Sequence, residues 1–238
     1  MMQFVSWLAL NPQGIADRAK GSGTAQTGLT LLEPVALGSI GFMFVSVAGF
    51  APWAFAGRAL HHAVGEVGLY AACAMVVIGL SGAVLHRLII GPGSCLRFYA
   101  LFSVAFTAYS VGWMIGWMAL RGNLGSLAGL LLGTVAMGWL LVRAFASRNE
   151  FLRVVAALFI LNALGYFAGG WVEGQVAAPS ANRLLGLSVT KQERMRVAML
   201  LWGVCYGLGL GAGLGLAFFY CQSRARALLM QRDKTHEP

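Results

Sequence analysis

The chain has 238 residues, of which 58% are apolar and only 11% are charged. Because a soluble domain carries about 25% charged residues, this composition excludes a compact water-soluble protein and indicates an all-α, polytopic membrane protein. The net charge is +9, but Lys and Arg lie singly or in small groups between apolar runs. We therefore predict no nucleic-acid partner, and we attribute the charge to positive residues on cytoplasmic loops and to contact with anionic membrane lipids.

Residues 1–34 precede the long apolar runs and are predicted to form an interfacial N-terminal segment and a loop. Residues 1–10 are apolar but too short to span a bilayer, so we expect a short helix in the interface with Trp7 at headgroup level. Residues 11–30 are rich in Gly, Ser, Thr and Gln, which is typical of an exposed connection.

Residues 35–220 are predicted to form one transmembrane domain of about six helices, since a spanning helix needs about 20 apolar residues. Glu33 and Pro34 favour a helix start, and the Gly91-Pro92-Gly93 sequence stops the second span. Residues 172–196 form the longest connection, and we expect 184–187 to lie flat on the membrane. The expected spans cover approximately residues 35–55, 66–90, 97–120, 124–145, 151–171 and 197–220.

Residues 221–238 are basic at first and are predicted to be a cytoplasmic tail that begins as a helix leaving the bilayer. Six spans put both termini on one side, and Lys and Arg on the short loops favour the cytoplasm for that side. We predict a bacterial cytoplasmic (inner) membrane protein.

Glycines recur every fourth residue in the last span, at Gly203, Gly207, Gly211 and Gly215. In a bilayer such spacing forms a smooth groove into which another helix can pack closely. A second ridge lies on the fourth span and consists of Gly125, Gly129 and Gly133. These ridges predict one closely packed bundle; the functional alternatives are helix faces that slide during transport or that line an oligomeric pore.

The third span is the most polar, and Ser103, Thr107 and Ser110 follow the spacing of one helix face, with Tyr109 beside them. Asn162 and Tyr166 are four residues apart on the fifth span. If the two faces meet, these six residues form a polar cleft that binds a small polar or amphiphilic solute. The alternative is ordinary hydrogen bonding between helices.

Ionisable residues lie at the predicted ends of spans, and no Asp, Glu, Lys or Arg lies at the centre of one. Because buried charges mark ion pathways, their absence there argues against an ion-driven pump. His62 and His86 are roughly 36 Å apart on one helix, so they cannot share a metal or a haem. The interfacial candidates are His61, His62, Glu66, His86, Arg97 and Glu173.

The scattered cysteines suggest no metal or redox site, and they are interpreted as small apolar fillers. The Gly79-Leu80-Ser81-Gly82 sequence resembles the GxSG motif of rhomboid-type intramembrane serine proteases. That resemblance would require a histidine on a later, facing helix, but after Ser81 the only histidines are His86 on the same helix and His236 in the tail.

Three hypotheses follow from these patterns. The favoured one is a small-solute or ion transporter or channel with a polar cleft between the third and fifth spans. The second is a non-catalytic subunit of a larger membrane complex, associated with pigments or other cofactors; the third is an intramembrane enzyme that acts on lipid. The sequence identifies no cofactor, and it leaves open whether the protein forms a homo-oligomer or joins a larger complex.

Overall fold

The computed structural model describes residues 7–20, 30–178, 183–184 and 187–236, and it is helical almost throughout. Short turns join the helices, and two described segments form an antiparallel pair of two-residue strands, β1 (Arg183–Leu184) and β2 (Leu187–Ser188). The all-α prediction is therefore confirmed. The helices are α2 (Pro12–Lys20), α3 (Leu32–Leu85), η1 (His86–Leu88), α4 (Ser94–Leu120), α5 (Gly122–Ala144), η2 (Arg148–Glu150), α6 (Phe151–Ala177), α7 (Lys191–Cys221) and α8 (Ser223–His236).

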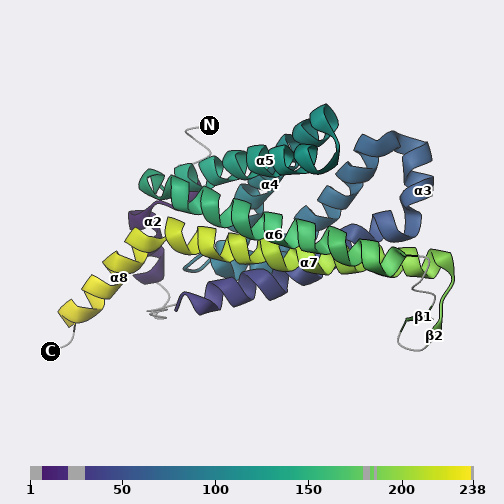
Figure 1. Cartoon of the computed structure of the whole chain (residues 1–238). Helices are drawn as coiled ribbons and strands as arrows, with labels where there is room; N and C mark the ends of the chain where they lie inside the picture. Colours follow the sequence, from purple (N-terminus) through teal and green to yellow (C-terminus); the bar gives the residue numbers. More distant parts are fainter. Residues whose placement is uncertain (1–6, 21–29, 179–182, 185–186, 237–238) are drawn as a thin grey trace.

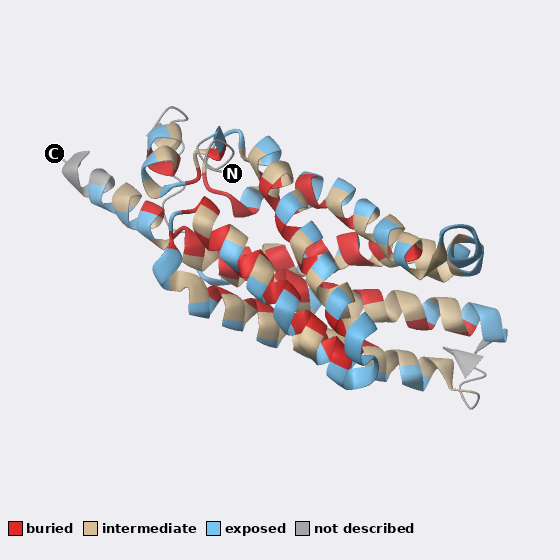
Figure 2. Cartoon of the chain, turned by 90° about the horizontal axis from the view of Figure 1, so that it is seen from above, coloured by how far each residue is buried: buried red, intermediate tan, exposed pale blue. Residues whose placement is uncertain are grey.

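Five of these helices are long and apolar enough to cross a membrane: α3, α4, α5, α6 and α7. Figure 2 shows buried residues where the helices meet and exposed residues on their outer faces. Many of those outward side chains are large and apolar, which suits lipid and not water. Examples are Ile40, Phe44, Met75, Leu124, Leu152 and Leu164.

Helix α3 contains both of the first two expected spans, and it is broken at Gly65, where φ is +73° and ψ is −177°. At 1.5 Å per residue an unbroken helix of this length would extend about 80 Å, far beyond the roughly 30 Å hydrocarbon core of a bilayer. Glycine adopts a positive φ without steric cost. Figure 1 shows α3 turning back at the end of the bundle that also holds β1 and β2.

Helices α3, α6 and α7 form one group through contacts between backbones. A Cβ built on Gly207 of α7 would lie 2.6 Å from Met43 Cα of α3, and one on Gly209 would lie 2.8 Å from Gly165 Cα of α6. Gly203, Gly211 and Gly215 also face α3. Helix α7 therefore has two glycine-lined faces, one packed against α3 and the other against α6. Figure 1 shows α6 and α7 side by side.

Helices α4 and α5 form a second group in the same way. A Cβ built on Gly112 of α4 would lie 2.9 Å from Gly133 Cα, and one on Gly116 would lie 2.5 Å from Gly129 Cα, both on α5. Gly125 lies near the turn that joins the two helices, where its Cβ would meet the Gly116 carbonyl at 3.2 Å. We refer to these helices as the α4–α5 pair and to the others as the α3–α6–α7 group.

Gln222 joins the end of α7 to the segment after α3. Its Oε1 accepts from the Ile90 N–H at 2.8 Å, and its Nε2 donates to the Leu88 carbonyl at 2.8 Å. The side chain is only 2% exposed, so the loss of its amide would leave two buried backbone groups without partners.

We expect Gln222→Leu to lower the free energy of unfolding by about 1–3 kcal/mol, the usual cost of an unpaired buried polar group. Thermal unfolding in detergent measures the change. Gln192→Leu is the matched control, because Gln192 is exposed near the start of α7. Equal melting temperatures for the two variants would contradict the role given to Gln222.

The N-terminal prediction is wrong for residues 12–20. This segment is helix α2, whose Ile15 and Ala16 are buried, and the Asn11 side chain accepts a hydrogen bond from the Gly14 N–H at 2.7 Å, as an N-cap does. Trp7 is exposed, whereas Leu8 and Leu10 are fully buried. Residues 1–6 and 21–29 of the predicted interfacial segment and loop lie outside the described residues.

The long connection is shorter than expected, because α6 continues to Ala177 and α7 begins at Lys191. A reciprocal cap starts α7: the Thr190 hydroxyl accepts from the Glu193 N–H, and the Glu193 carboxylate accepts from the Thr190 N–H. Residues 185–186 of the stretch expected to lie on the membrane are outside the described residues. The tail begins as the helix α8, as predicted.

Candidate functional site

The most buried polar contacts between spanning helices centre on Tyr109 of α4. Asn162 of α6 donates from Nδ2 to the Tyr109 hydroxyl oxygen at 2.9 Å, and the Tyr206 hydroxyl of α7 donates to the same oxygen at 3.1 Å. Asn162 is 0% exposed and Tyr109 is 3% exposed. These three residues, which we call the polar triad, join the α4–α5 pair to the α3–α6–α7 group.

A second polar link lies one turn further along α6. The Ser126 hydroxyl of α5 and the Tyr166 hydroxyl of α6 are 3.1 Å apart. Ser126 is buried, and Tyr166 is on the same helix face as Asn162 because the two are four residues apart. Hydrogen bonds thus join α4 and α5 to one face of α6, and Tyr206 of α7 reaches this network through Tyr109.

Aromatic rings continue the site from the polar triad toward the end of the bundle where α3 turns back. Consecutive ring centroids are 5.3–6.4 Å apart, and most pairs are tilted or edge-to-face, the arrangement that aromatic quadrupoles favour. The rings come from α3, α4, α6 and α7. We call them the aromatic shell, which consists of Phe50, Trp53, Tyr70, Trp113, Tyr166 and Trp202.

Three polar atoms of this region are buried and have no hydrogen-bond partner among the described residues. They are Asn162 Oδ1, Trp113 Nε1 and Trp202 Nε1. Nearly all buried polar groups in proteins are paired with protein, water or ligand. The site therefore has one acceptor and two donors available for a bound molecule or for ordered water.

An ion pair lies between the break in α3 and the turn between α4 and α5. Arg121 Nη1 is 3.3 Å from Glu66 Oε1, and the Tyr70 hydroxyl donates to the same oxygen at 3.1 Å. Arg121 also lies over the Trp117 ring. Because Tyr70 belongs to the aromatic shell, this ion pair connects the shell to the surface.

The six interfacial candidates do not form one site. His61 and His62 contact each other near the break in α3, and Glu173 is half-buried near the end of α6. At the opposite end, His86 Nδ1 is 3.0 Å from the Gly82 carbonyl oxygen, and Arg97 donates to Leu8 O at 2.9 Å. Within the described part of the chain, no three His, Cys, Asp or Glu residues lie close enough together to hold a metal.

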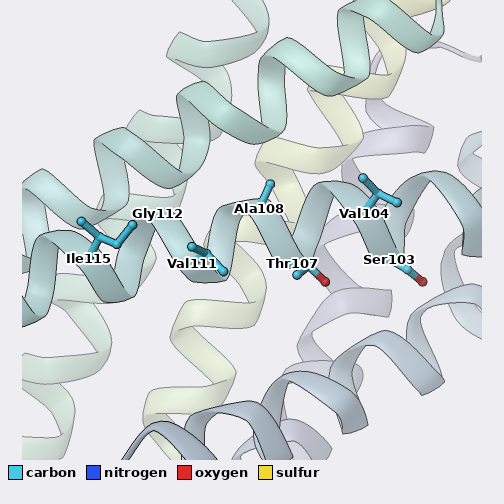
Figure 3. A pocket seen from close by; sticks show the side chains of 7 residues that line it. All are labelled: Ser103, Val104, Thr107, Ala108, Val111, Gly112 and Ile115. Carbon is cyan, nitrogen blue, oxygen red and sulfur yellow. The ribbon is translucent and has the colours of Figure 1, made fainter. Parts of the chain in front are cut away.

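Ser103 and Thr107 are not part of the polar triad region. They line an open groove of about 640 Å³ on the outer face of α4, together with Val104, Ala108, Val111, Gly112 and Ile115. Figure 3 shows these seven residues along a single helix. Ser110 is half-buried and is not among the residues that line this groove. The structure thus brings together Tyr109, Asn162 and Tyr166 of the predicted cleft, but not Ser103 or Thr107.

The reason lies in the aromatic face of α4. Phe98, Phe102, Phe106 and Tyr109 are buried and follow one another at steps of three and four. Since apolar residues at that spacing form the packed side of a helix, the hydroxyl residues on the opposite side must face outward. Ser126, Tyr206, Trp113 and Trp202 were not predicted as site residues, although Tyr206 lies between two of the groove-forming glycines.

Ser81 has a local structural role. Its hydroxyl is buried and donates to the Val77 carbonyl at 2.6 Å on the same helix, which is a common way for serine to be satisfied inside a helix. Among the described residues it contacts no histidine that would activate it.

We compared the chain with protein-family models, curated proteins and solved structures, and no match was found. The functional argument therefore depends on the site itself.

Proposed function

We propose that this integral membrane protein moves a small polar or amphiphilic solute across the membrane, and that the polar triad and the aromatic shell form its solute site. The observation that carries this proposal is Oδ1 of Asn162, a fully buried acceptor where three helices meet, which no donor of the described residues satisfies. A polar group left unpaired there costs free energy, and a bound solute would recover it.

The two sets of helices supply a way to open the site. Inside each set, glycines hold the backbones in contact. Between the sets, much of the polar contact depends on side-chain hydrogen bonds, such as Tyr109–Asn162, Tyr206–Tyr109 and Ser126–Tyr166. Each such bond is worth about 0.6–2 kcal/mol in a membrane. A displacement of the α4–α5 pair that breaks these bonds would open the site while the glycine contacts persist. It must also separate the Phe42 ring of α3 from Phe102 and Phe106 of α4.

The available groups indicate the kind of solute. Asn162 Oδ1 would accept one hydrogen bond, the Trp113 and Trp202 indoles would donate two, and the ring faces would contact an apolar body. Binding sites for small molecules combine mainly apolar walls with a few polar groups in this way. A small polar or amphiphilic solute, as expected from the sequence, would suit a site with apolar ring faces, one hydrogen-bond acceptor and two donors.

We further propose that α3 crosses the membrane twice, which gives six spans and places both termini in the cytoplasm of a bacterial cell. The break at Gly65 and the return of α3 support this count. The charge of the short loops supports the orientation.

The test is solute flux into vesicles that contain the purified protein, with Asn162→Leu as the informative variant. Glycerol, urea and glycine serve as small polar probes, and tryptamine serves as an amphiphilic one. We expect Asn162→Leu to reduce the flux at least tenfold, because the leucine removes both the acceptor and the bond to Tyr109. Thr107→Val is the control, since Thr107 lies on the outer face of α4, and its flux should equal that of the wild type.

Gel filtration and thermal unfolding check that Asn162→Leu remains folded. If the wild type transports none of these probes, or if a folded Asn162→Leu variant transports them at the wild-type rate, the proposal is wrong.

A second candidate is the non-catalytic subunit of a larger membrane assembly, including a homo-oligomer. The observation in its favour is the groove on α4, whose rim carries the exposed Val104, Val111 and Ile115. In that case, purification in a mild detergent should recover partner chains in fixed ratio. A single monodisperse monomer would contradict it.

A further inference from the structure

Two arginines lie together at the end of the bundle opposite the break in α3. Arg18 belongs to α2, where its Nη1 donates to the Ala9 carbonyl. Its Nε and Nη2 are buried and have no hydrogen-bond partner among the described residues. A guanidinium carries five N–H donors, so a substantial part of this cation lacks a partner.

Arg97 is the neighbouring cation, in the first turn of α4. It donates from Nε to the Leu8 carbonyl at 2.9 Å and from Nη1 to the Gly93 carbonyl at 2.8 Å. Burial, and then the positive charge of Arg97, lower the pKa of Arg18. Both guanidiniums donate to backbone carbonyls, and the ion pairs of the described residues include neither of them. Within the described part of the chain, two cations are thus held close together, and neither forms an ion pair with a carboxylate.

The turn before α4 adds a third source of positive potential. A Cβ built on Gly91 would lie 3.9 Å from the Cβ of Arg18, so Arg18 lies against the turn formed by residues 91–93. Gly93 is the N-cap of α4, with φ +67° and no side chain to cap the helix, and the first turn of α4 has no acidic residue. The first N–H groups of a helix attract anions.

We propose that Arg18 and Arg97, with the start of α4, form a binding site for a phosphate group. Two positive charges this close repel each other, and a bound anion would offset that repulsion. Phosphate matches the planar fork of arginine, which can donate two parallel hydrogen bonds to it. The headgroup of an anionic phospholipid and free inorganic phosphate both present this group.

The site is independent of the solute site, which lies toward the other end of the bundle. It also gives α2 a function. This helix buries Ile15 and Ala16 against the bundle and contacts α8, and it positions Arg18 over the turn. A bound phosphate would therefore tie α2 to α4.

The test measures binding to the purified full-length chain in neutral maltoside detergent. The probes are inorganic phosphate and short-chain phosphatidylglycerol, with chloride at equal ionic strength and short-chain phosphatidylcholine as their controls. The readouts are the shift of the melting temperature and the bound mass in native mass spectrometry. We expect the wild type to bind a phosphate-bearing probe, and we expect roughly tenfold or more weaker binding for Arg18→Gln and Arg97→Gln, since each loses charge-assisted hydrogen bonds.

Arg148→Gln is the matched control, because Arg148 is an exposed arginine in η2, and it should bind as the wild type does. Arg18→Lys keeps the positive charge but loses the planar guanidinium that donates two parallel hydrogen bonds, so this variant should also bind more weakly. It serves as the test if Arg18→Gln does not fold. Binding of both probes identifies a general phosphate site, and binding of phosphatidylglycerol alone identifies a headgroup site. If the wild type binds neither probe, or if Arg18→Lys and Arg97→Gln bind as the wild type does, the proposal is overturned.

Discussion

Replacing Gly207 with leucine should strongly destabilise the contact between α7 and α3. A Cβ at this position would lie 2.6 Å from Met43 Cα and 2.8 Å from Ser46 Cβ, and leucine adds three further carbons. The backbones of α3 and α7 must then separate, and the loss of contact extends to the neighbouring Gly203 and Gly211. We expect a loss of about 3 kcal/mol in the free energy of unfolding, the upper part of the range for overpacked cores.

Unfolding by dodecyl sulfate in mixed micelles, followed by circular dichroism, measures this loss. Gly170→Leu in α6 is the matched control, because a Cβ at Gly170 would meet no atom within 4 Å. That variant should unfold within about 0.5 kcal/mol of the wild type, as surface substitutions do. Similar losses for both variants would show that α3 and α7 do not pack through their backbones.

Gly129→Leu should separate α4 from α5 while the α3–α6–α7 group stays folded. A Cβ at Gly129 would lie 3.1 Å from Trp113 Cα, so a leucine cannot be placed between the two helices. The α3–α6–α7 group has its own glycine contacts, which this change does not touch. We expect a loss of about 1–3 kcal/mol that is confined to the α4–α5 pair.

Hydrogen–deuterium exchange of the protein in nanodiscs distinguishes local from global loss. Faster exchange should appear in α4 and α5, with unchanged protection in α6 and α7. Uniform acceleration in every helix would contradict the division into two sets of helices on which the proposed opening of the site depends.

The helical architecture could be predicted because it follows from local patterns. The length of the apolar segments was enough to predict α4, α5, α6 and α7. The spacing of glycines at every fourth residue identified the glycines of α7 that face α3. The partner of that groove could not be predicted, because Met43 and Gly207 are 164 positions apart in the sequence. The break of α3 at Gly65 was not predicted either. A single glycine in the sequence does not reveal a positive φ.

The candidate site was predicted in part for a related reason. Tyr109, Asn162 and Tyr166 were identified by residue type and spacing, and the structure brings them together. Ser103 and Thr107 were grouped with Tyr109 because they are polar, but the burial of Phe102 and Phe106 decides which way α4 faces. In a membrane the packed face of a helix is not always its most polar face.

The amphipathic character of α2 was missed because Gly, Ser and Thr dominate the residues around it. Among residues 12–19 of that helix, only Ile15 and Ala16 are buried, and two residues are too short a pattern to outweigh the polar surroundings. The pairing of Arg18 with Arg97 is likewise a tertiary feature, since the two are 79 positions apart in the sequence.

The most direct test of the account is the labelling of single cysteines from each side of the membrane. His61, Arg148, Gly174 and Arg224 would each be replaced by cysteine in a chain whose four natural cysteines are serine, and intact cells would be treated with a membrane-impermeant maleimide. We predict labelling at positions 61 and 174 from outside the cell, and at positions 148 and 224 only after the membrane is opened. Labelling of all four positions from one side would contradict a chain that crosses the membrane repeatedly and returns at Gly65.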